Sequence, residues 1–545
     1  MQEAEFNRYV DRLVLEILER QPVLATSMGI HTWDDRLADY SPSSMERSIA
    51  ELKARLAELE QADVSGFSEE GQIDFVLFTH LLRSLVRSHE KIAHHLTNPN
   101  FYLDEAMSGI LLLIMKEFAP LPERLRSVLG RVREVPRLLA QARANLQPER
   151  VPRTWAALAL EQAQMGPGLF QGLLPGLAKD VPDLAGGLRE AGEEAAATLV
   201  EFARYLEEEL LPAARGDFAV GEDLFNELLR EDHMVNYDAD ELLETGWRLF
   251  RETEAEMKEL AREIDPTKTA EQILEEAKAD HPTAEELLDT YRRAMESTRQ
   301  FVIDHDIATI PKGERLQIVE TPEYLRPLIP YAAYMPPGIF EEELQGFFLV
   351  TPVDPGSSPE EREQRLKGHH HAKLPVTALH EGYPGHHLQL VRSVTHGTTA
   401  RKLGMMLSTL FIEGWAFYCE ELMEQAGYIS TPIQRLARLS DQLWRAGRII
   451  LDVSLHCKGM SEQEAVDFLV TRCHLEPANA RAEVRRYTAT PTQPQSYLMG
   501  KLEILGIVEE YRRRNPGASL REMHDAILAC GSLPPRLMRR QLFGA

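Results

Sequence analysis

Apolar residues recur at intervals of three and four along much of this chain. The segments FNRYVDRLVLEILER and SMERSIAELKARLAELEQ near the N-terminus show this spacing clearly. An α-helix repeats every 3.6 residues, so the spacing places the apolar side chains on one face of each helix. The sequence therefore predicts a large, mainly α protein whose helices pack through their apolar faces.

The pattern changes between about residues 313 and 354. The pieces LQIVE, YAAYMPPG and GFFLVTPV are short, rich in β-branched or aromatic residues and punctuated by proline. These features are typical of strands. We therefore expect one small antiparallel β-sheet in an otherwise helical chain.

The chain has 545 residues, which is long for one compact core. With 43% hydrophobic and 27% charged residues, its composition is that of a globular protein. We expect an N-terminal helical lobe over residues 1–215 and a second lobe over residues 216–545. The second lobe would hold the sheet and the candidate site described below.

Charge and apolar content exclude several classes of partner. The formal net charge of −26 argues against nucleic acid, whose binding depends on clustered Lys and Arg. No stretch approaches the roughly 18 uninterrupted apolar residues of a membrane span, and the N-terminus lacks the apolar segment of a signal peptide. Four cysteines without a Cys-x-x-Cys pair are expected to be reduced. These features predict a cytoplasmic protein without membrane contact, and they do not indicate an oligomeric state.

The motif HEGYPGHH, residues 380–387, has the His-Glu pair of a zinc-binding helix but not its usual spacing. In that helix the second histidine follows four residues after the first, whereas Pro384 occupies this position here. In an unbroken helix, His387 would lie roughly 10 Å from His380 along the axis. One zinc ion with bonds near 2 Å cannot bridge that distance.

A break in the helix would resolve the conflict. Pro384 has no N–H group to continue the helix, and Gly385 permits backbone angles closed to other residues. His386 would then take the place of the second histidine, with His387 as the alternative ligand or as a neighbour that supports the site. Glu381 follows the first histidine directly, where a general base stands beside the metal.

A catalytic zinc site typically has three protein ligands and one water, so a third ligand is expected downstream. The segment STLFIEGWAFYCEELMEQ places Glu413 among aromatic and apolar residues. Burying a carboxylate there is costly unless a positive charge compensates it, and zinc would do so. Glu420, seven residues later on the same helical face, is a weaker candidate for a residue that supports the ligands.

Four segments carry a family resemblance: HEGYPGHHLQ, FIEGWAFY, RAGRIILDVSLHCKGMSEQEAVDFL and YTATPTQPQSYLMGKLEI. Together they resemble the bacterial family called domain of unknown function 885, and the N-terminal LATSMGIHTWDDRLADYSPS extends the resemblance over nearly the whole chain. That family is grouped with zincin-like metallopeptidases, and its layout is similar to the largely helical gluzincins of the angiotensin-converting-enzyme and thimet-oligopeptidase kind. The resemblance implies a zincin-like active-site helix in a deep cleft between helical lobes. It also implies that His380, His386 and Glu413 bind one Zn²⁺ ion.

A row of polar side chains follows downstream. Arg445, Arg448, Asp452 and His456 are spaced by three or four residues, which places them on one face of a helix. The spacing alone fits an exposed ladder of ion pairs equally well. The family resemblance favours a buried network near the zinc, formed in part by Asp452 and His456, in which Arg448 anchors a peptide carboxylate through paired hydrogen bonds.

The last motif, TPTQPQSYLMGK, is a proline-rich turn that leads into a helix. By resemblance to such peptidases, Tyr497 would donate its hydroxyl to the oxyanion formed on the attacked carbonyl. Gln493 and Lys501 are expected to contact substrate, although a structural turn and a surface lysine fit these positions equally well.

The function predicted is that of a zinc metallopeptidase of the carboxypeptidase or oligopeptidase kind, acting on short peptides. A zinc-activated water would attack the amide, and Glu381 would accept its proton and pass it to the leaving nitrogen. One alternative is a zinc hydrolase of non-peptide amides or esters. Another is a helical binding scaffold with a structural or vestigial metal site, but a scaffold has no use for Glu381.

Overall fold

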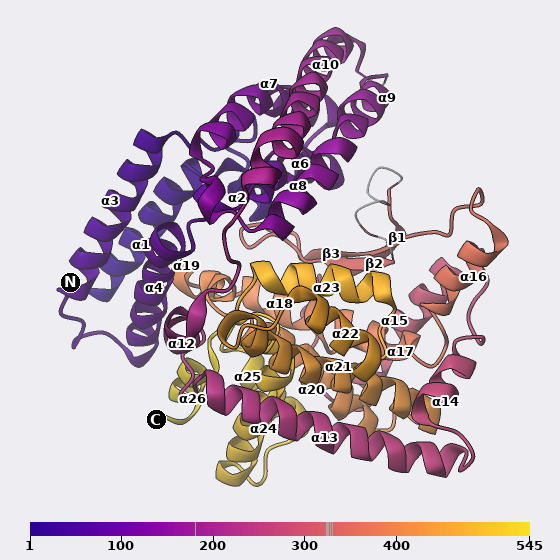
Figure 1. Ribbon diagram of the computed structural model, residues 1–545. Coiled ribbons are helices and arrows are strands. Elements are labelled where there is room, and N and C mark those ends of the chain that lie inside the picture. Colours follow the sequence, from indigo (N-terminus) through magenta and orange to yellow (C-terminus); the bar gives the residue numbers. More distant parts are fainter. Residues whose placement is uncertain (180, 323–325, 327–328, 330, 545) are drawn as a thin grey trace. The chain divides into compact units, whose positions relative to one another are not determined.

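The computed structural model describes residues 1–179, 181–322, 326, 329 and 331–544, and it is mainly helical (Figure 1). The prediction of a mainly α chain is confirmed. The chain divides into two compact units. Unit 1 comprises Met1–Ser68, Phe78–Phe218 and Gly338–Glu341, and unit 2 comprises Glu69–Leu77, Ala219–Pro337 and Glu342–Ala545. The expected lobe boundary at residues 215 and 216 stays a prediction.

Unit 1 is built around a long helix, α7, which packs against α6 and α10. Several of its helices begin with proline in their first turn, where the missing N–H group costs no hydrogen bond. Its helices are α1 (Glu3–Glu19), α2 (Pro22–Ser27), α3 (Pro42–Glu60), α5 (His94–Thr97), α6 (Asn100–Met115), α7 (Leu121–Asn145), α8 (Arg153–Met165), α9 (Leu174–Ala178), α10 (Pro182–Tyr205) and α11 (Leu211–Ala213); α4 (Glu69–Arg87) begins in unit 2 and continues into unit 1.

Unit 2 is organised around α21, which packs along α13 and also contacts α14, α17 and α22 to α24. A second close pair is formed by α20 and α24. Within the described residues, no helix is both long and apolar enough to cross a membrane. The helices of this unit are α12 (Gly221–Glu231), α13 (Ala239–Ile264), α14 (Ala270–Ala277), α15 (Leu287–Asp304), α16 (Pro359–Lys367), α17 (Leu374–Glu381), α18 (His386–Val394), α19 (Thr399–Lys402), α20 (Leu410–Gln425), α21 (Pro432–Cys457), α22 (Glu462–Arg472), α23 (Pro477–Ala489), α24 (Ser496–Arg514), α25 (Leu520–Leu528) and α26 (Pro535–Phe543).

The small sheet also lies in unit 2, and it is mixed. Its strands β1 (Arg315–Glu320), β2 (Ala332–Met335) and β3 (Gln345–Val350) have the order β1-β3-β2. β3 pairs antiparallel with β2 but parallel with β1. The prediction of an antiparallel sheet is therefore wrong for the pair β1 and β3. Two strands joined by a connection of more than a dozen residues, as these are, can pair in parallel.

The sheet supports the helix that carries the first histidine of the motif. Phe348 and Val350 of β3 pack with Tyr291 and Met295 of α15 and with Leu374 of α17 in one apolar cluster. All five side chains are nearly inaccessible to solvent. The cluster therefore fixes α17 against the sheet and α15.

Candidate metal centre

Two helices meet at the HEGYPGHH motif. α17 ends at Glu381 and α18 begins at His386, with a turn over residues 382–385 between them. The predicted break in the helix is confirmed, because proline supplies no N–H group for a continuing helix. A Cβ atom on Gly385 would lie 1.9 Å from the carbonyl oxygen of His380. The turn therefore requires glycine at this position.

Neighbouring side chains hold this turn from two sides. Trp415 of α20 donates its indole N–H to the carbonyl oxygen of Pro384 at 2.8 Å. On the other side, Tyr383 donates its hydroxyl to Oε2 of Glu314 at 2.5 Å, and the same oxygen lies 2.8 Å from Nε2 of His387. The ring of His387 is therefore engaged by Glu314, which precedes β1.

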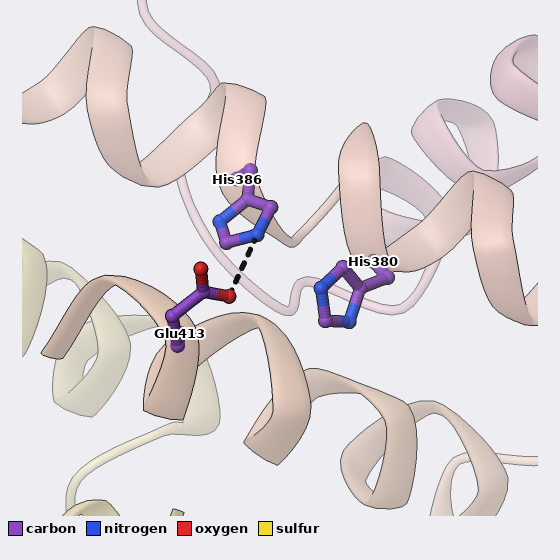
Figure 2. A group of neighbouring side chains, drawn as sticks. All are labelled: His380, His386 and Glu413. Carbon is purple, nitrogen blue, oxygen red and sulfur yellow. Dashed lines mark ion pairs between the residues drawn. The ribbon is translucent and has the colours of Figure 1, made fainter. Parts of the chain in front are cut away.

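The three predicted ligands come together beside the turn. His380 on α17 and His386 on α18 face Glu413 on α20 (Figure 2). One ligand atom of each lies within 4.8 Å of the other two, and Nε2 of His386 is 3.4 Å from Oε2 of Glu413. Two atoms bound to one tetrahedral zinc ion at about 2.1 Å are roughly 3.4 Å apart. The structure therefore brings His386, rather than His387, into the ligand group.

The electrostatics of this group fit a bound cation. Burial raises the pKa of Glu413, but the imidazoles of His386 and His380 and the guanidinium of Arg448 outweigh burial and hold that pKa at about 2. Oε2 of Glu413 and Nδ1 of His386 are buried and have no hydrogen-bond partner among the described residues. A carboxylate oxygen that is buried beside two imidazoles and makes no hydrogen bond matches the donor set of a Zn²⁺ site.

Glu420 contacts one of the predicted ligands. Its Oε1 lies 2.8 Å from Nδ1 of His380, and its side chain is 2% exposed. An imidazole that donates from Nδ1 to a carboxylate keeps Nε2 free for a metal ion. Glu420 thus lies behind a predicted ligand, which is the position expected from the sequence.

A cavity of about 360 Å³ opens onto the ligand group, a size at the small end of the range for ligand pockets. The predicted general base, the predicted oxyanion donor and the predicted carboxylate anchor reach this same cavity. The lining residues are Tyr334, Pro336, His380, Glu381, His386, Leu390, Ile412, Glu413, Arg445, Arg448 and Tyr497.

Tyr497 reaches the cavity because α20 and α24 cross at a very short distance. A Cβ atom on Gly414 would lie 2.3 Å from the carbonyl carbon of Gly500, and a Cβ on Gly500 would lie 2.1 Å from the carbonyl oxygen of Leu410. Glu413 directly precedes the first of these glycines, and Tyr497 lies one turn before the second. Burial raises the pKa of Tyr497, so its hydroxyl keeps its proton and can donate a hydrogen bond.

Gln493 and Lys501, expected to contact substrate, are not among the described residues that line the cavity. Gln493 accepts a hydrogen bond from Arg486 at 2.7 Å. Lys501 lies 2.6 Å from a carboxylate oxygen of Glu421 and donates to Gln442 at 2.9 Å. Neighbouring protein groups engage both side chains, so the geometry gives a substrate contact no support.

Asp452 and His456 are both buried, but they lie outside the described lining of the cavity, so their predicted place in a network around the ligands stays a prediction. Oδ1 of Asp452 accepts the backbone N–H of Thr492 at 3.1 Å, and Nε2 of His456 lies 3.0 Å from the carbonyl oxygen of Tyr487. Asp452 therefore holds the turn that leads into α24, and His456 contacts the last turn of α23.

Tyr334 and Glu314 are polar residues of this site that the sequence did not predict. Tyr334 on β2 lines the cavity, and its hydroxyl lies 3.0 Å from Nδ1 of His387. Glu314 holds both Tyr383 and His387. Both lie in or beside the sheet, far upstream of the motif. The available signals were only a tyrosine within a predicted strand and an acid just before one.

Comparisons with known proteins agree with the motifs. Residues 22–542 match the family described as "Bacterial protein of unknown function (DUF885)", and the chain belongs to this family. The chain is similar to "a putative lipoprotein of unknown function from Shewanella oneidensis", with 25% identity, 99% of each chain covered and a TM-score of 0.81. It also has the fold of "the putative lipoprotein from Colwellia psychrerythraea", with 16% identity, 98% of each chain covered and a TM-score of 0.83. None of the curated proteins compared matches the chain.

These comparisons correct one expectation. Each of these two structures is described as a "putative lipoprotein", and lipoproteins are anchored to membranes by a covalent lipid. The prediction of a cytoplasmic location is therefore wrong. It was based on the lack of long apolar segments, but a lipid anchor is a covalent modification that needs no apolar helix.

Proposed function

We propose that this chain is a zinc-dependent metallopeptidase of the gluzincin type that hydrolyses peptide bonds in short peptides. The observation that carries the proposal is the convergence of His380, His386 and Glu413 at the wall of a cavity that Glu381 and Tyr497 also line. When bound, Zn²⁺ would polarise the scissile carbonyl and lower the pKa of a water molecule.

The chain's own residues would perform the proton transfers. Glu381 follows the first ligand directly and lines the cavity. Its carboxylate would accept a proton from the attacking water and pass it to the leaving nitrogen. Tyr497, which burial keeps protonated, would donate its hydroxyl to the oxygen of the attacked carbonyl.

The edge of the sheet supports a peptide as the substrate. β2 is the last strand in the order β1-β3-β2. Tyr334 within it and Pro336 just after it line the cavity. An extended peptide can add to such an edge through main-chain hydrogen bonds, which tolerate many side chains.

Glu381→Gln tests the proposal. Glutamine cannot accept the proton, so turnover should fall by about 100-fold or more, while one zinc ion per chain stays bound. Elemental analysis measures the metal, and a library of short peptides, small amides and esters measures hydrolysis. The exposed Glu509 provides a control, and Glu509→Gln should retain full activity.

The possible results separate the candidate functions. Undiminished hydrolysis in Glu381→Gln would refute the assignment of the general base. Hydrolysis of small amides or esters without peptides would make the chain a zinc hydrolase of non-peptide substrates. Bound zinc without hydrolysis of any class would leave a binding scaffold with a structural metal.

A further inference from the structure

Two arginine side chains form part of the wall of the same cavity. Arg445 and Arg448 lie three residues apart on α21, and both line the cavity. Their side chains are 12% and 5% exposed. A guanidinium group stays charged at every physiological pH, and burying it is costly unless acceptors surround it.

Arg445 shares its acidic partner with a second cation. Its Nη1 lies 3.1 Å from Oδ1 of Asp441, and Nζ of Lys373 lies 2.9 Å from the same oxygen. Asp441 therefore balances only one of these two positive charges. Nε of Arg445 is buried and has no hydrogen-bond partner among the described residues.

Arg448 also shares its acidic partner with a second cation. Its Nη2 lies 3.1 Å from Oε2 of Glu483, and Nη2 of Arg486 lies 2.8 Å from that oxygen. Its Nε donates to the hydroxyl of Tyr487 at 2.9 Å, but its buried Nη1 has no partner within the described part of the chain. Asp441 is thus shared by Arg445 and Lys373, and Glu483 is shared by Arg448 and Arg486. The four positive charges have only these two carboxylates as ion-pair partners among the described residues.

Aromatic rings hold both guanidinium groups in place. Cζ of Arg448 lies 4.2 Å from the ring centre of Trp444 and 4.4 Å from that of Tyr497. Cζ of Arg445 lies 4.6 Å and 5.7 Å from the same two rings. Stacking occupies the face of a guanidinium and leaves N–H groups at its edge for an acceptor. Both groups are therefore preorganised to bind an anion.

We propose that Arg445 and Arg448 bind the C-terminal carboxylate of the peptide, so that the enzyme releases residues from the C-terminal end. This inference rests on the proposed function, in which a divalent cation balances Glu381 and Glu413. The two positive charges beside the arginines then lack a counterion, and a substrate carboxylate would supply it. Because the arginines and the metal ligands share one small cavity, that carboxylate must lie close to the scissile amide.

The net charge of the chain strengthens this assignment. A protein with a formal net charge of −26 repels anionic ligands at long range. Only a local excess of positive charge can reverse that repulsion at the site. The shared carboxylates of Asp441 and Glu483 leave such an excess at the cavity wall.

Three matched dipeptides test the proposal. N-benzoyl-glycyl-glutamine has a C-terminal carboxylate, its amide has none, and N-benzoyl-glycyl-glutamate α-amide has one on the side chain only. Their affinities are measured by calorimetry on Glu381→Gln, which should not turn them over, with zinc and after its removal. The free acid should bind at least about tenfold more tightly than either amide while zinc is bound. The preference should become smaller after zinc is removed, because Glu413 then lacks its counterion and competes for the arginines.

Arginine variants then assign the preference to its residues. In the Glu381→Gln background, Arg445→Gln or Arg448→Gln should each reduce the preference to about threefold or less. Arg448→Lys should restore part of it, because the charge returns without the paired donors. Arg513, 74% exposed, provides the control, and Arg513→Gln should change nothing. Circular dichroism verifies that each variant folds. If the arginine variants do not fold, the affinities of the three ligands for Glu381→Gln alone decide whether the cavity prefers a C-terminal carboxylate.

Failure of this inference is distinguishable from failure of the proposed function. Equal affinity for all three ligands, or equal affinity for the side-chain and C-terminal carboxylates, would overturn the C-terminal site. Equally fast cleavage of amidated peptides and free acids by the wild type would also overturn the C-terminal site. The proposed zinc-dependent hydrolysis would remain supported by that result. A preference for the free acid in a protein without hydrolysis would support the carboxylate site and refute the peptidase.

Discussion

The orientation of one imidazole ring decides which of its nitrogen atoms can bind a metal ion. In His380, Nδ1 is paired with Glu420 at 2.8 Å, so Nε2 is left to face His386 and Glu413. A carboxylate behind a histidine ligand also raises the basicity of the ring. In the proposed metal site, Glu420 would thus act through His380 rather than by contact with the substrate.

Glu420→Gln should weaken zinc binding by about 10- to 100-fold, because the amide keeps the shape but loses the negative charge behind the ligand. Competition with a chromophoric chelator measures the affinity. Glu509→Gln, at an exposed position on α24, is the matched control and should bind zinc as the wild type does. Equal affinity in Glu420→Gln would show that the hydrogen bond does not tune the metal.

At the scale of elements, the site depends on how closely α20 approaches α24. The two helices touch at Gly414 and Gly500, where neither position has room for a Cβ atom. This contact sets Glu413 of one helix and Tyr497 of the other at the same cavity. The distance between Glu413 and Tyr497 in the proposed reaction therefore depends on how closely α20 and α24 pack.

Gly414→Ala should destabilise the protein by about 1–3 kcal/mol, because the added methyl group meets backbone atoms that cannot move independently. The free energy of unfolding is measured by chemical denaturation. Gly517 is exposed and has no atom within 4 Å of its Cβ position, so Gly517→Ala should change stability little. A Gly414→Ala variant as stable as the wild type would mean that the helices can separate without cost.

At the scale of the whole molecule, the proposed metal ligands and the cavity lie within unit 2. An ion that binds only the folded form stabilises it by mass action, by about 2.7 kcal/mol at a free concentration 100 times Kd. Zinc should therefore stabilise unit 2.

Removal of zinc with a chelator should lower the unfolding temperature of unit 2. Differential scanning calorimetry is the suitable measurement, because a chain with two units need not unfold in a single two-state step. His386→Ala removes one ligand and should abolish the response to the chelator. An equal response in wild type and His386→Ala would locate the stabilising ion elsewhere.

Local chemistry allowed much of this protein to be predicted from its sequence. The 3.6-residue period predicts helices from neighbouring residues alone. Pro384 favours a break in the interior of a helical segment, because it lacks an N–H group and its ring clashes with the preceding turn. Once the break is expected, His380, His386 and Glu413 become the natural donor set, and the structure brings these three together.

Tertiary structure alone decided the features that depend on residues far apart in the chain. The parallel pairing of β1 with β3, the engagement of His387 by Glu314 and the place of Tyr334 in the cavity have no local signal. The same holds for Arg445 and Arg448, whose spacing fits an exposed ladder as well as a cavity wall. Which side chains meet depends on packing across the whole unit, and no short stretch of sequence encodes that packing.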